Sequence, residues 1–563
     1  MCGILGYISS TKISQEKFND TLKLIVHRGP DNLSSIFETI QNKEIALGHT
    51  RLSIIDLSEK SNQPLTIDDY TIIFNGEIYN YKALKVSLEK NGVVFTTQSD
   101  TETILQSYIK YGMRQTIDTL KGMFAFAILD KKENKIILAR DRIGIKPLYY
   151  LLNDNNFIFS SEIKTIKNLS KDKLKIDEES SVNYYYHRHI NEPKTIYKEI
   201  NAVESGQYLE LELKNFLITK INYWTLIRSS KEQDEKKVID KVEELLNESV
   251  KEHLVSDVPI SFAFSGGTDS SLLISIAKQY QNNITAFTIK RSDNDIDWIY
   301  SKKIAKYLNI NQKINDFNNL DIDGVDKRLY KIYDQPIGCS SIFSTYLLYK
   351  TMIKEFKVCI SGDGGDEIFG GYNWYQHFLD TKHPTLNILR SLNRLRAFIR
   401  HKYFLPKNDI EKYKKIMLDR FTKIDIEKLL DNNIKVEEIE MYKKYIEKID
   451  SIQDMMYVDF FTFLRYNLIR LDLSSMAHSL ESRVPFLDHK LVEYAYTIDP
   501  KLHYKNGELK YILKKVAERY LPKKYIYRPK KGFSAPIMNI LPVKSGKEYQ
   551  KYIFNQWKEY HNE

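Results

Sequence analysis

The chain has 563 residues, a length that excludes a single small domain and is typical of three or four domains or of a large two-domain enzyme. Hydrophobic residues make up 42% and charged residues 28%, so there is enough apolar material for a buried core and wholesale disorder is excluded. The net charge of +10 suggests an anionic partner without requiring one.

Cysteine content and hydropathy indicate a cytoplasmic protein. The three cysteines, Cys2, Cys339 and Cys359, are too few for a disulfide framework or a cysteine-rich zinc module, and they fit a reducing compartment best. Apolar runs stay at strand length, below the 18 or more residues of a transmembrane helix, and the first residues lack the basic and apolar regions of a signal peptide. We therefore expect no transmembrane segment.

Residues 1–212 combine many β-rich runs with few helices. Strands are predicted at 45–54, 70–74, 124–129, 135–139 and 157–160. Helices are predicted at 18–26 and 81–90. Because most neighbouring elements are strands, this part of the chain is expected to form a sheet-plus-helix domain of the α+β class.

A polar connecting segment at 213–240 precedes a change of pattern, and residues 241–563 read as a second domain. Its first helix is expected to begin at 238, followed by helices at 269–280, 297–308 and 342–355. Strands are expected between them at 260–264, 285–289 and 357–360. Alternating strands and helices predict a doubly wound parallel α/β sheet.

The excess positive charge is concentrated at 381–423, where 12 basic residues face 3 acidic ones. Apolar residues recur at helical spacing between arginines over 388–400, which predicts a basic amphipathic helix. Two readings stay open: a solvated helix that covers the core, or an element that binds anions or a membrane surface. Nucleic acid is not an expected partner, because no recognised binding module accompanies the charge.

Cys2 is the first candidate for chemistry. Removal of Met1 would leave its α-amine beside its thiol, so that one residue carries both a nucleophile and a base. Five further motifs occur in order in the same domain: His27–Asp31, Gly48–Ile54, Asn75–Asn80, Ser99–Glu102 and Asp141–Pro147. With Cys2, this set resembles the class II glutamine amidotransferases, whose glutaminase domain is an N-terminal-nucleophile αββα sandwich.

The resemblance implies a role for each matching residue of the glutaminase domain. Cys2 is implied to attack the side-chain amide of glutamine and to form a γ-glutamyl thioester. Asn75 and the backbone N–H of Gly76 match the oxyanion hole, which places donors where negative charge develops. The glutamine-binding residues implied, beside Asn75, are Arg51 for the α-carboxylate, Asp100 for the α-ammonium, and Glu77, which helps to fix that amine.

Each of these residues also has a plain structural reading. Asn75 and Gly76 form a common hairpin-turn pair, and Arg51 or Asp100 would serve equally well in a surface ion pair. The full set of motifs, in order, favours the functional reading.

The second domain contains a strand, a glycine turn and a helix start at 260–271. Glycines let backbone N–H groups approach phosphate, and the positive end of a helix favours an anion there. The turn lacks the Lys-Ser/Thr ending of a Walker A loop. The candidate ATP-binding residues in it are Phe264, Ser265, Gly266, Gly267, Asp269 and Ser270.

An acidic loop at 361–367 follows the strand predicted at 357–360. Its three carboxylates in five positions would repel one another unless a cation or a base role occupies the site. Ser361 and Gly362 are further candidate ATP-binding residues, and Asp269 and Asp366 are candidate Mg²⁺ ligands. Together, the glycine turn and this loop resemble the pyrophosphate loop and acidic loop of the glutamine-hydrolysing asparagine synthase family.

That family resemblance implies the whole reaction. ATP loses pyrophosphate while its AMP is joined to a substrate carboxylate, and ammonia from the first domain then attacks the acyl-adenylate. Asp363 matches the acidic residue associated with acceptor activation. Lys530, in the matching segment Arg528–Phe533, is implied to meet developing charge, although a solvated surface lysine is its plain reading.

The acceptor is the open question. Leu473 stands where the family often has an arginine, and this puts aspartate in doubt as the acceptor. The leading expectation is aspartate amidation to asparagine with release of AMP and pyrophosphate. The alternative is amidation of a sugar uronic acid or another carboxylate in surface polysaccharide biosynthesis. The sequence does not determine the assembly state, for which a homodimer is the candidate.

Overall fold

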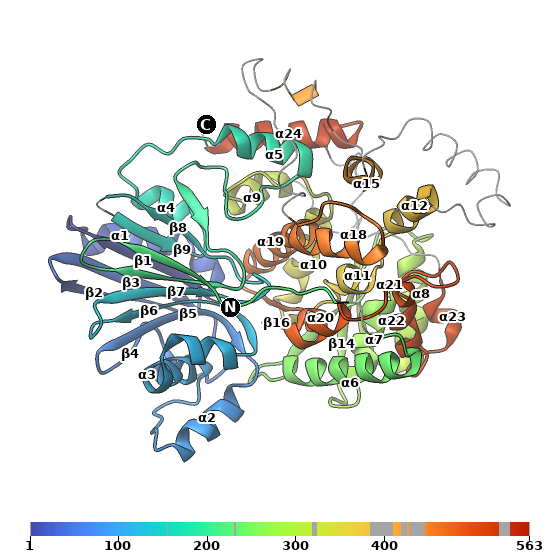
Figure 1. The fold of residues 1–563 in the computed structure, drawn as a ribbon, viewed down its shortest axis with the longest axis horizontal. Helices are drawn as coiled ribbons and strands as arrows, with labels where there is room; N and C mark the ends of the chain where they lie inside the picture. Colours follow the sequence, from blue (N-terminus) through green and yellow to red (C-terminus); the bar gives the residue numbers. More distant parts are fainter. Residues whose placement is uncertain are drawn as a thin grey trace.

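The structure is a computed structural model that describes residues 2–154, 156–229, 232–317, 324–382, 409–417, 421, 425–426, 429, 445–528 and 541–561. Figure 1 shows two parts side by side, with stacked sheets at the left and a helix-covered sheet at the right. None of the described helices is long and apolar enough to cross a membrane.

The first part is a sandwich of two six-stranded sheets. One has the strand order β10-β8-β9-β1-β3-β2, with β1 (Gly3–Ser9) antiparallel to both β9 (Asn156–Ser160) and β3 (Lys43–Arg51). Its other strands are β2 (Asn32–Ile40), β8 (Tyr149–Leu152) and β10 (Ile200–Ala202). Placing β1 in the middle of this sheet brings the N-terminus into the interior.

The second sheet has the order β12-β11-β7-β6-β5-β4. Its strands are β4 (Leu65–Ile67), β5 (Tyr70–Ile78), β6 (Gly122–Asp130), β7 (Lys135–Arg140), β11 (Gln207–Glu212) and β12 (Ile218–Asn222). Apolar side chains of both sheets, such as Ile4, Leu47, Ile73 and Ala127, form one buried cluster between them. The strand β12 thus lies in the segment 213–240 and belongs to this sheet.

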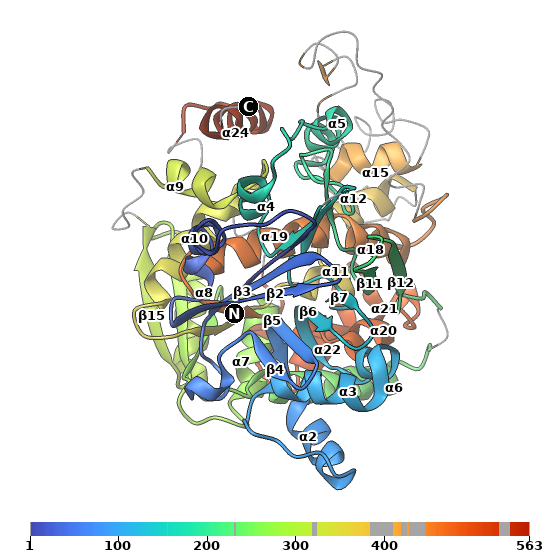
Figure 2. The same cartoon turned by 90° about the vertical axis from the view of Figure 1, so that its left-hand side faces the viewer.

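Helices cover the outer faces of the two sheets (Figure 2). The helices α1 (Gln15–Lys23) and α4 (Ile163–Leu169) contact strands of the first sheet, and α3 (Asp100–Thr119) contacts β5 of the second. The remaining helices of this part are α2 (Tyr81–Lys90), as predicted, and α5 (Glu178–His187). The layers are helix, sheet, sheet and helix, which confirms the predicted αββα sandwich.

The second part has a parallel five-stranded sheet of order β15-β14-β13-β16-β17. Its strands are β13 (Ile260–Ala263), β14 (Thr285–Lys290), β15 (Asn311–Asp316), β16 (Val358–Ile360) and β17 (Glu481–Arg483). Cys359 lies in β16 and is fully buried. All neighbouring strands are parallel, which confirms the predicted doubly wound α/β fold.

Many helices follow in the second part, and among them α7, α8, α10 and α19 contact strands of the parallel sheet (Figure 1). In chain order the helices of this part are α6 (Glu235–His253), α7 (Thr268–Ala277), α8 (Ile296–Leu308), α9 (Val325–Ile332), α10 (Ser341–Met352), α11 (Gly365–Phe369), α12 (Asn373–Lys382), α15 (Asp409–Met417), α18 (Ile452–Phe461) and α19 (Phe463–Met476). They are followed by α20 (His489–Ala495), α21 (Pro500–His503), α22 (Tyr511–Ala517), α23 (Lys523–Ile526) and α24 (Gly546–His561). The amphipathic helix predicted at 388–400 lies outside the described residues.

The C-terminal helix α24 returns to the first domain and lies beside α5 (Figure 1). Gln550 donates its side-chain amide to the backbone oxygen of Tyr185 at 2.9 Å, and the Tyr184 hydroxyl donates to the backbone oxygen of Gln550 at 3.0 Å. Phe554 and Trp557 of α24 belong to the same buried cluster as these tyrosines. The last helix of the chain therefore ties the two domains together.

Candidate active sites

The first candidate site lies where β1 begins beside β5. Cys2 is 8% exposed, and its backbone N–H donates to Asn75 Oδ1 at 3.0 Å. The other side-chain atom of Asn75, Nδ2, is buried without a hydrogen-bond partner among the described residues. A buried amide that holds the nucleophile with its oxygen therefore keeps an unused N–H donor beside it.

Gly76 has a backbone that only glycine adopts easily. Its φ is +153°, and an added Cβ would lie 2.1 Å from the backbone oxygen of Met123 in β6. Any side chain would push β5 and β6 apart at the residue that follows Asn75. Glycine at this position keeps the site closely packed.

Burial shapes the charge state of the site. It raises the pKa of the Cys2 thiol, so the thiol needs a base to become a nucleophile. Burial likewise raises the pKa of Asp100 to about 6, although Asp100 accepts a hydrogen bond from the Ile78 N–H at 3.0 Å. The pKa of Glu77 is raised well above its usual range by burial and by the negative charge of Glu481. Buried carboxylates with raised pKa values are stabilised in their charged form by a cationic group such as an α-ammonium.

Arg51 is buried, and its guanidinium is hydrogen-bonded to the loop that follows it in the sequence. Its guanidinium donates to the backbone oxygen of Ser58 and to Asn62 Oδ1, both at 2.8 Å, and to the backbone oxygen of Asp56. These bonds shape residues 55–62 beside the site. Its predicted contact with a glutamine carboxylate stays a prediction.

Arg28 is a site residue to which the sequence assigned no role. It is fully buried, and its Nε donates to the backbone oxygen of Cys2 at 3.0 Å. Its guanidinium also pairs with Glu162 at 3.0 Å and with Asp472 of α19 at 2.9 Å. The nucleophile is thus held through Arg28 by a helix of the second domain. The motif that contains Arg28, His27–Asp31, is the feature of the sequence that could have identified it as a site residue.

The second candidate site lies at the carboxyl ends of β13 and β16. The glycine turn leaves β13, and Gly266 has a φ of +65°, where an added Cβ would lie 2.6 Å from the backbone nitrogen of Ser301. The Gly267 N–H donates to Ser265 Oγ at 3.2 Å, just before α7 begins. The turn thus ends at the amino terminus of a buried helix, a favourable place for phosphate.

The acidic loop lies directly against the glycine turn because β16 pairs with β13 in parallel. Added Cβ atoms at Gly362 and Gly365 would lie 3.3 Å from Asp269 Cβ and 3.2 Å from Asp269 Cγ. Ser361 Oγ donates to the side chain of Asp363. The structure therefore brings together the predicted ATP-binding residues of the two loops.

Lys510 lies between the two predicted metal ligands, Asp269 and Asp366. Its sequence context did not identify it as a site residue. Its Nζ lies 2.6 Å from both carboxylate oxygens of Asp269 and 2.7 Å from Asp366 Oδ1. Burial alone would lower its pKa, but the two carboxylates more than offset this, and the pKa is raised. An added Cβ at Gly371 would lie 2.0 Å from Lys510 Cε, so glycine makes room for this side chain.

The position of Lys510 tests whether a cation fits between these aspartates. One positive group already contacts both carboxylates, so the pair is spaced for a single cation. Within the described ranges, no group of three or more His, Cys, Asp and Glu side chains could hold a metal ion. The two aspartates supply only part of the oxygen ligands that a Mg²⁺ would need.

Asp363 contacts α19. Arg470 pairs with Asp363 Oδ1 at 2.7 Å and donates to Thr345 Oγ1 at 2.7 Å. Leu473, one turn further along α19, is buried in the main apolar cluster.

The third carboxylate of the acidic loop is Glu367. It accepts hydrogen bonds from Tyr372 at 2.7 Å and Asn467 at 2.9 Å, and burial raises its pKa to about 7. Lys530 lies outside the described residues.

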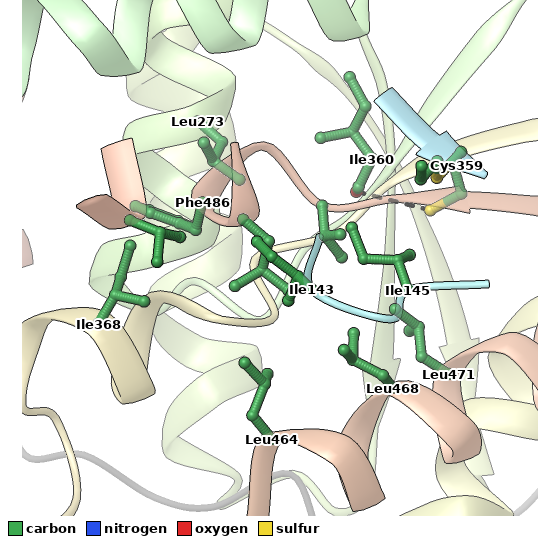
Figure 3. Packing of buried hydrophobic residues seen from close by; sticks show 14 of the residues in the cluster. Ile143, Ile145, Leu273, Cys359, Ile360, Ile368, Leu464, Leu468, Leu471 and Phe486 are labelled. Atoms are coloured by element: carbon green, nitrogen blue, oxygen red, sulfur yellow. Dashed lines mark hydrogen bonds between the residues drawn. The ribbon is translucent and has the colours of Figure 1, made fainter. Parts of the chain in front are cut away.

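An apolar layer lies between the domains (Figure 3). Ile143 and Ile145, from the first domain, pack among Leu464, Leu468 and Leu471 of α19. Ile360 and Phe486 of the second domain belong to the same cluster. This region is therefore packed with hydrocarbon side chains.

Comparisons with known proteins cover almost the whole chain. The asparagine synthase family matches residues 241–562, and the glutamine amidotransferase domain matches residues 1–224. "Asparagine synthetase [glutamine-hydrolyzing] 1" of Bacillus subtilis is 32% identical over 96% of this chain and 88% of its own length. "Putative asparagine synthetase [glutamine-hydrolyzing] 2" of Methanocaldococcus jannaschii is 37% identical over 66% of this chain and 76% of its own length.

Proposed function

We propose, since the chain belongs to the asparagine synthase family of glutamine-dependent amidotransferases, that it makes ammonia at Cys2 and uses it to amidate an adenylated carboxylate. The single observation that carries this proposal is the position of Asn75, which holds the Cys2 backbone with one side-chain atom and offers a free donor with the other. We propose aspartate as the acceptor, in keeping with the names of the relatives.

In the proposed first reaction, the Cys2 sulfur attacks the side-chain carbonyl carbon of glutamine. The thiol proton passes to the α-amine, which Met1 removal would free, and then to the leaving ammonia. Negative charge on the carbonyl oxygen is met by Asn75 Nδ2 and the Gly76 N–H. Water then hydrolyses the thioester and releases glutamate.

In the proposed second reaction, the acceptor carboxylate attacks the α-phosphorus of ATP and pyrophosphate leaves. The glycine turn, 264–270, supplies backbone N–H groups and hydroxyls to the phosphates. Mg²⁺, held by Asp269 and Asp366, would neutralise phosphate charge. Ammonia then attacks the acyl carbon, and AMP leaves. Asp363 is proposed to take the proton that ammonia loses, with Arg470 holding its carboxylate in place.

The two reactions need a shared, dry route for ammonia. Ammonia released into bulk water at neutral pH would become ammonium, which is not a nucleophile. We propose that ammonia crosses at the apolar layer of the domain interface, which is buried away from bulk water (Figure 3).

A screen of acceptors tests the proposal. The full chain is incubated with ATP, Mg²⁺ and amide-¹⁵N glutamine, together with aspartate, other amino-acid carboxylates or uronic acids. AMP and pyrophosphate are measured, and mass spectrometry follows the ¹⁵N label. Aspartate-dependent AMP release with labelled asparagine is the expected result. Label in an amidated uronic acid would instead favour the polysaccharide alternative.

A Cys2→Ala variant separates the two sites. It is expected to abolish synthesis with glutamine and to retain synthesis with ammonium salts, because the two reactions use different residues. Loss of both activities in a folded variant would refute separate sites. Glutaminase activity without AMP release for any carboxylate would leave only the first half of the proposal standing.

A further inference from the structure

The short strand β17 sends its side chains to two different places. Ser482 Oγ lies 3.1 Å from the hydroxyl of Tyr349 in α10, within the second domain. Glu481 and Arg483 point to the opposite face, as successive residues of a strand must, and lie beside Glu77 of the first domain. All three residues of β17 are buried, with exposures of 2% or less.

Arg483 uses its guanidinium to join both domains. Its Nε donates to Glu481 Oε1 at 2.6 Å, and its Nη1 donates to the backbone oxygens of His253 at 2.8 Å and Val255 at 2.6 Å. Its Nη2 lies 3.5 Å from Glu77 Oε2. These contacts orient the guanidinium toward Glu77 by three bonds that need no substrate.

The charges around Glu77 explain why a cation is needed there. Glu481 of β17 and Asp100 of α3 both add negative charge and, with burial, favour protonation of Glu77. Arg483 opposes them by favouring the carboxylate form of Glu77. The carboxyl groups of Glu77, Glu481 and Asp100 are thus gathered around one guanidinium, a setting that favours a further cation such as the α-ammonium of an amino acid.

Arg483 also contacts the second site through its backbone. Its backbone oxygen accepts a hydrogen bond from the N–H of Ser361 at 2.8 Å, where the acidic loop begins. One residue thus contacts the glutaminase site with its side chain and the acidic loop with its main chain. A substitution of the side chain leaves the second contact available.

We propose that Arg483 is a positioning residue of the glutaminase site, supplied by the ATP-using domain, which holds the Glu77 carboxyl group in place and aims it at the α-ammonium of glutamine. This inference rests on the proposed glutamine site around Cys2. It means that the first domain does not contain its whole substrate-binding site, because the guanidinium comes from a strand more than 400 positions away in the sequence.

Steady-state kinetics with two nitrogen donors test the inference. Arg483→Met is expected to raise the KM for glutamine about 10- to 100-fold, the usual range for loss of a charged partner, while kcat with glutamine changes little. Kinetics with ammonium salts are expected to stay within about twofold, since they bypass the glutamine site. Arg483→Lys is expected to recover part of the glutamine affinity because it restores the positive charge.

A double-mutant cycle with Glu77→Gln distinguishes positioning from general support of the fold. If Arg483 acts through Glu77, the Arg483→Lys change alters the KM for glutamine in the wild type and has little further effect in the Glu77→Gln background. The cycle of Arg483→Lys and Glu77→Gln also tests the inference if Arg483→Met does not fold. Arg519→Met, which removes a partly exposed, ion-paired arginine in the turn after α22, is the matched control.

The outcomes separate this inference from the proposed function. Equal losses with glutamine and ammonium, or additive effects in the cycle, would overturn the role of Arg483 while leaving the glutaminase site intact. A wild-type chain without Cys2-dependent glutaminase activity would instead overturn the proposed function.

Discussion

Replacing Lys510 by methionine should weaken the second domain and make it responsive to Mg²⁺. Each contact of Lys510 Nζ at 2.6–2.7 Å is worth about 6 kcal/mol of Coulomb energy at an effective dielectric of 20, before desolvation is subtracted. Removing one partner of such a buried set typically costs about 3–5 kcal/mol, because the remaining charges stay uncompensated. Asp269 and Asp366 would then face each other without a cation.

This loss in the free energy of unfolding corresponds to a measurable change of melting temperature. For a unit of about 320 residues, a loss of 3–5 kcal/mol lowers Tm by about 4–8 °C. Mg²⁺ added alone should restore stability, by about 2.7 kcal/mol at 100 times its Kd, since it would replace the missing ammonium. In the wild type, Lys510 competes for the same carboxylates, so Mg²⁺ without nucleotide should change Tm much less.

The assay is thermal unfolding of the full chain, followed by fluorescence or calorimetry, with and without Mg²⁺. Lys514→Met is the matched control. Lys514 lies in α22, the helix that begins directly after Lys510, and it pairs with Glu508, which is 43% exposed, so that less than about 1 kcal/mol should be lost. The reasoning would be refuted if Lys510→Met melted like the wild type, or if Mg²⁺ stabilised both proteins equally.

Three further predictions concern activity. Asn75→Ala should lower kcat for glutamine hydrolysis by about 10²–10³, since it removes an oxyanion donor, while synthesis from ammonium persists; an unchanged kcat would contradict this role. Asp363→Asn should lower formation of the amidated product by at least about 10²-fold with glutaminase activity retained, and equal loss of both would argue against it. Because burial raises the pKa of Asp100 to about 6, kcat/KM for glutamine should fall about tenfold per pH unit below that value as the carboxylate gains a proton. A profile that stayed flat between pH 5 and 7 would count against a role for ionised Asp100.

Local patterns were sufficient wherever a motif is continuous in the chain. The strand, glycine turn and helix around residues 260–277 could be predicted because each depends on its own residues and their near neighbours. The helix at 81–90 and the buried strand around Cys359 were recognised for the same reason. Among the site residues, Asn75 could be named because its motif accompanies Cys2 in the sequence.

The residues that sequence reasoning missed act across long separations. Lys510 is one of 84 lysines and arginines, and only the folded chain places it beside Asp269, 241 positions earlier. Arg28 meets Asp472 across 444 positions. The local sequence of Lys510 does not distinguish it from a solvated cation, and the motif that contains Arg28 does not reveal its partner, because each partner lies on another element.

The sequence by itself determined the family, the two kinds of fold and the positions of the two candidate sites, since these depend on short motifs and hydrophobic periodicity. The tertiary structure alone decided how the sites are completed: Arg483 reaches the proposed glutaminase site from the other domain, and Lys510 joins the glycine turn to the acidic loop. Burial is the physical reason. Charges removed from water must find partners wherever the fold places them, and chain order does not reveal those partners.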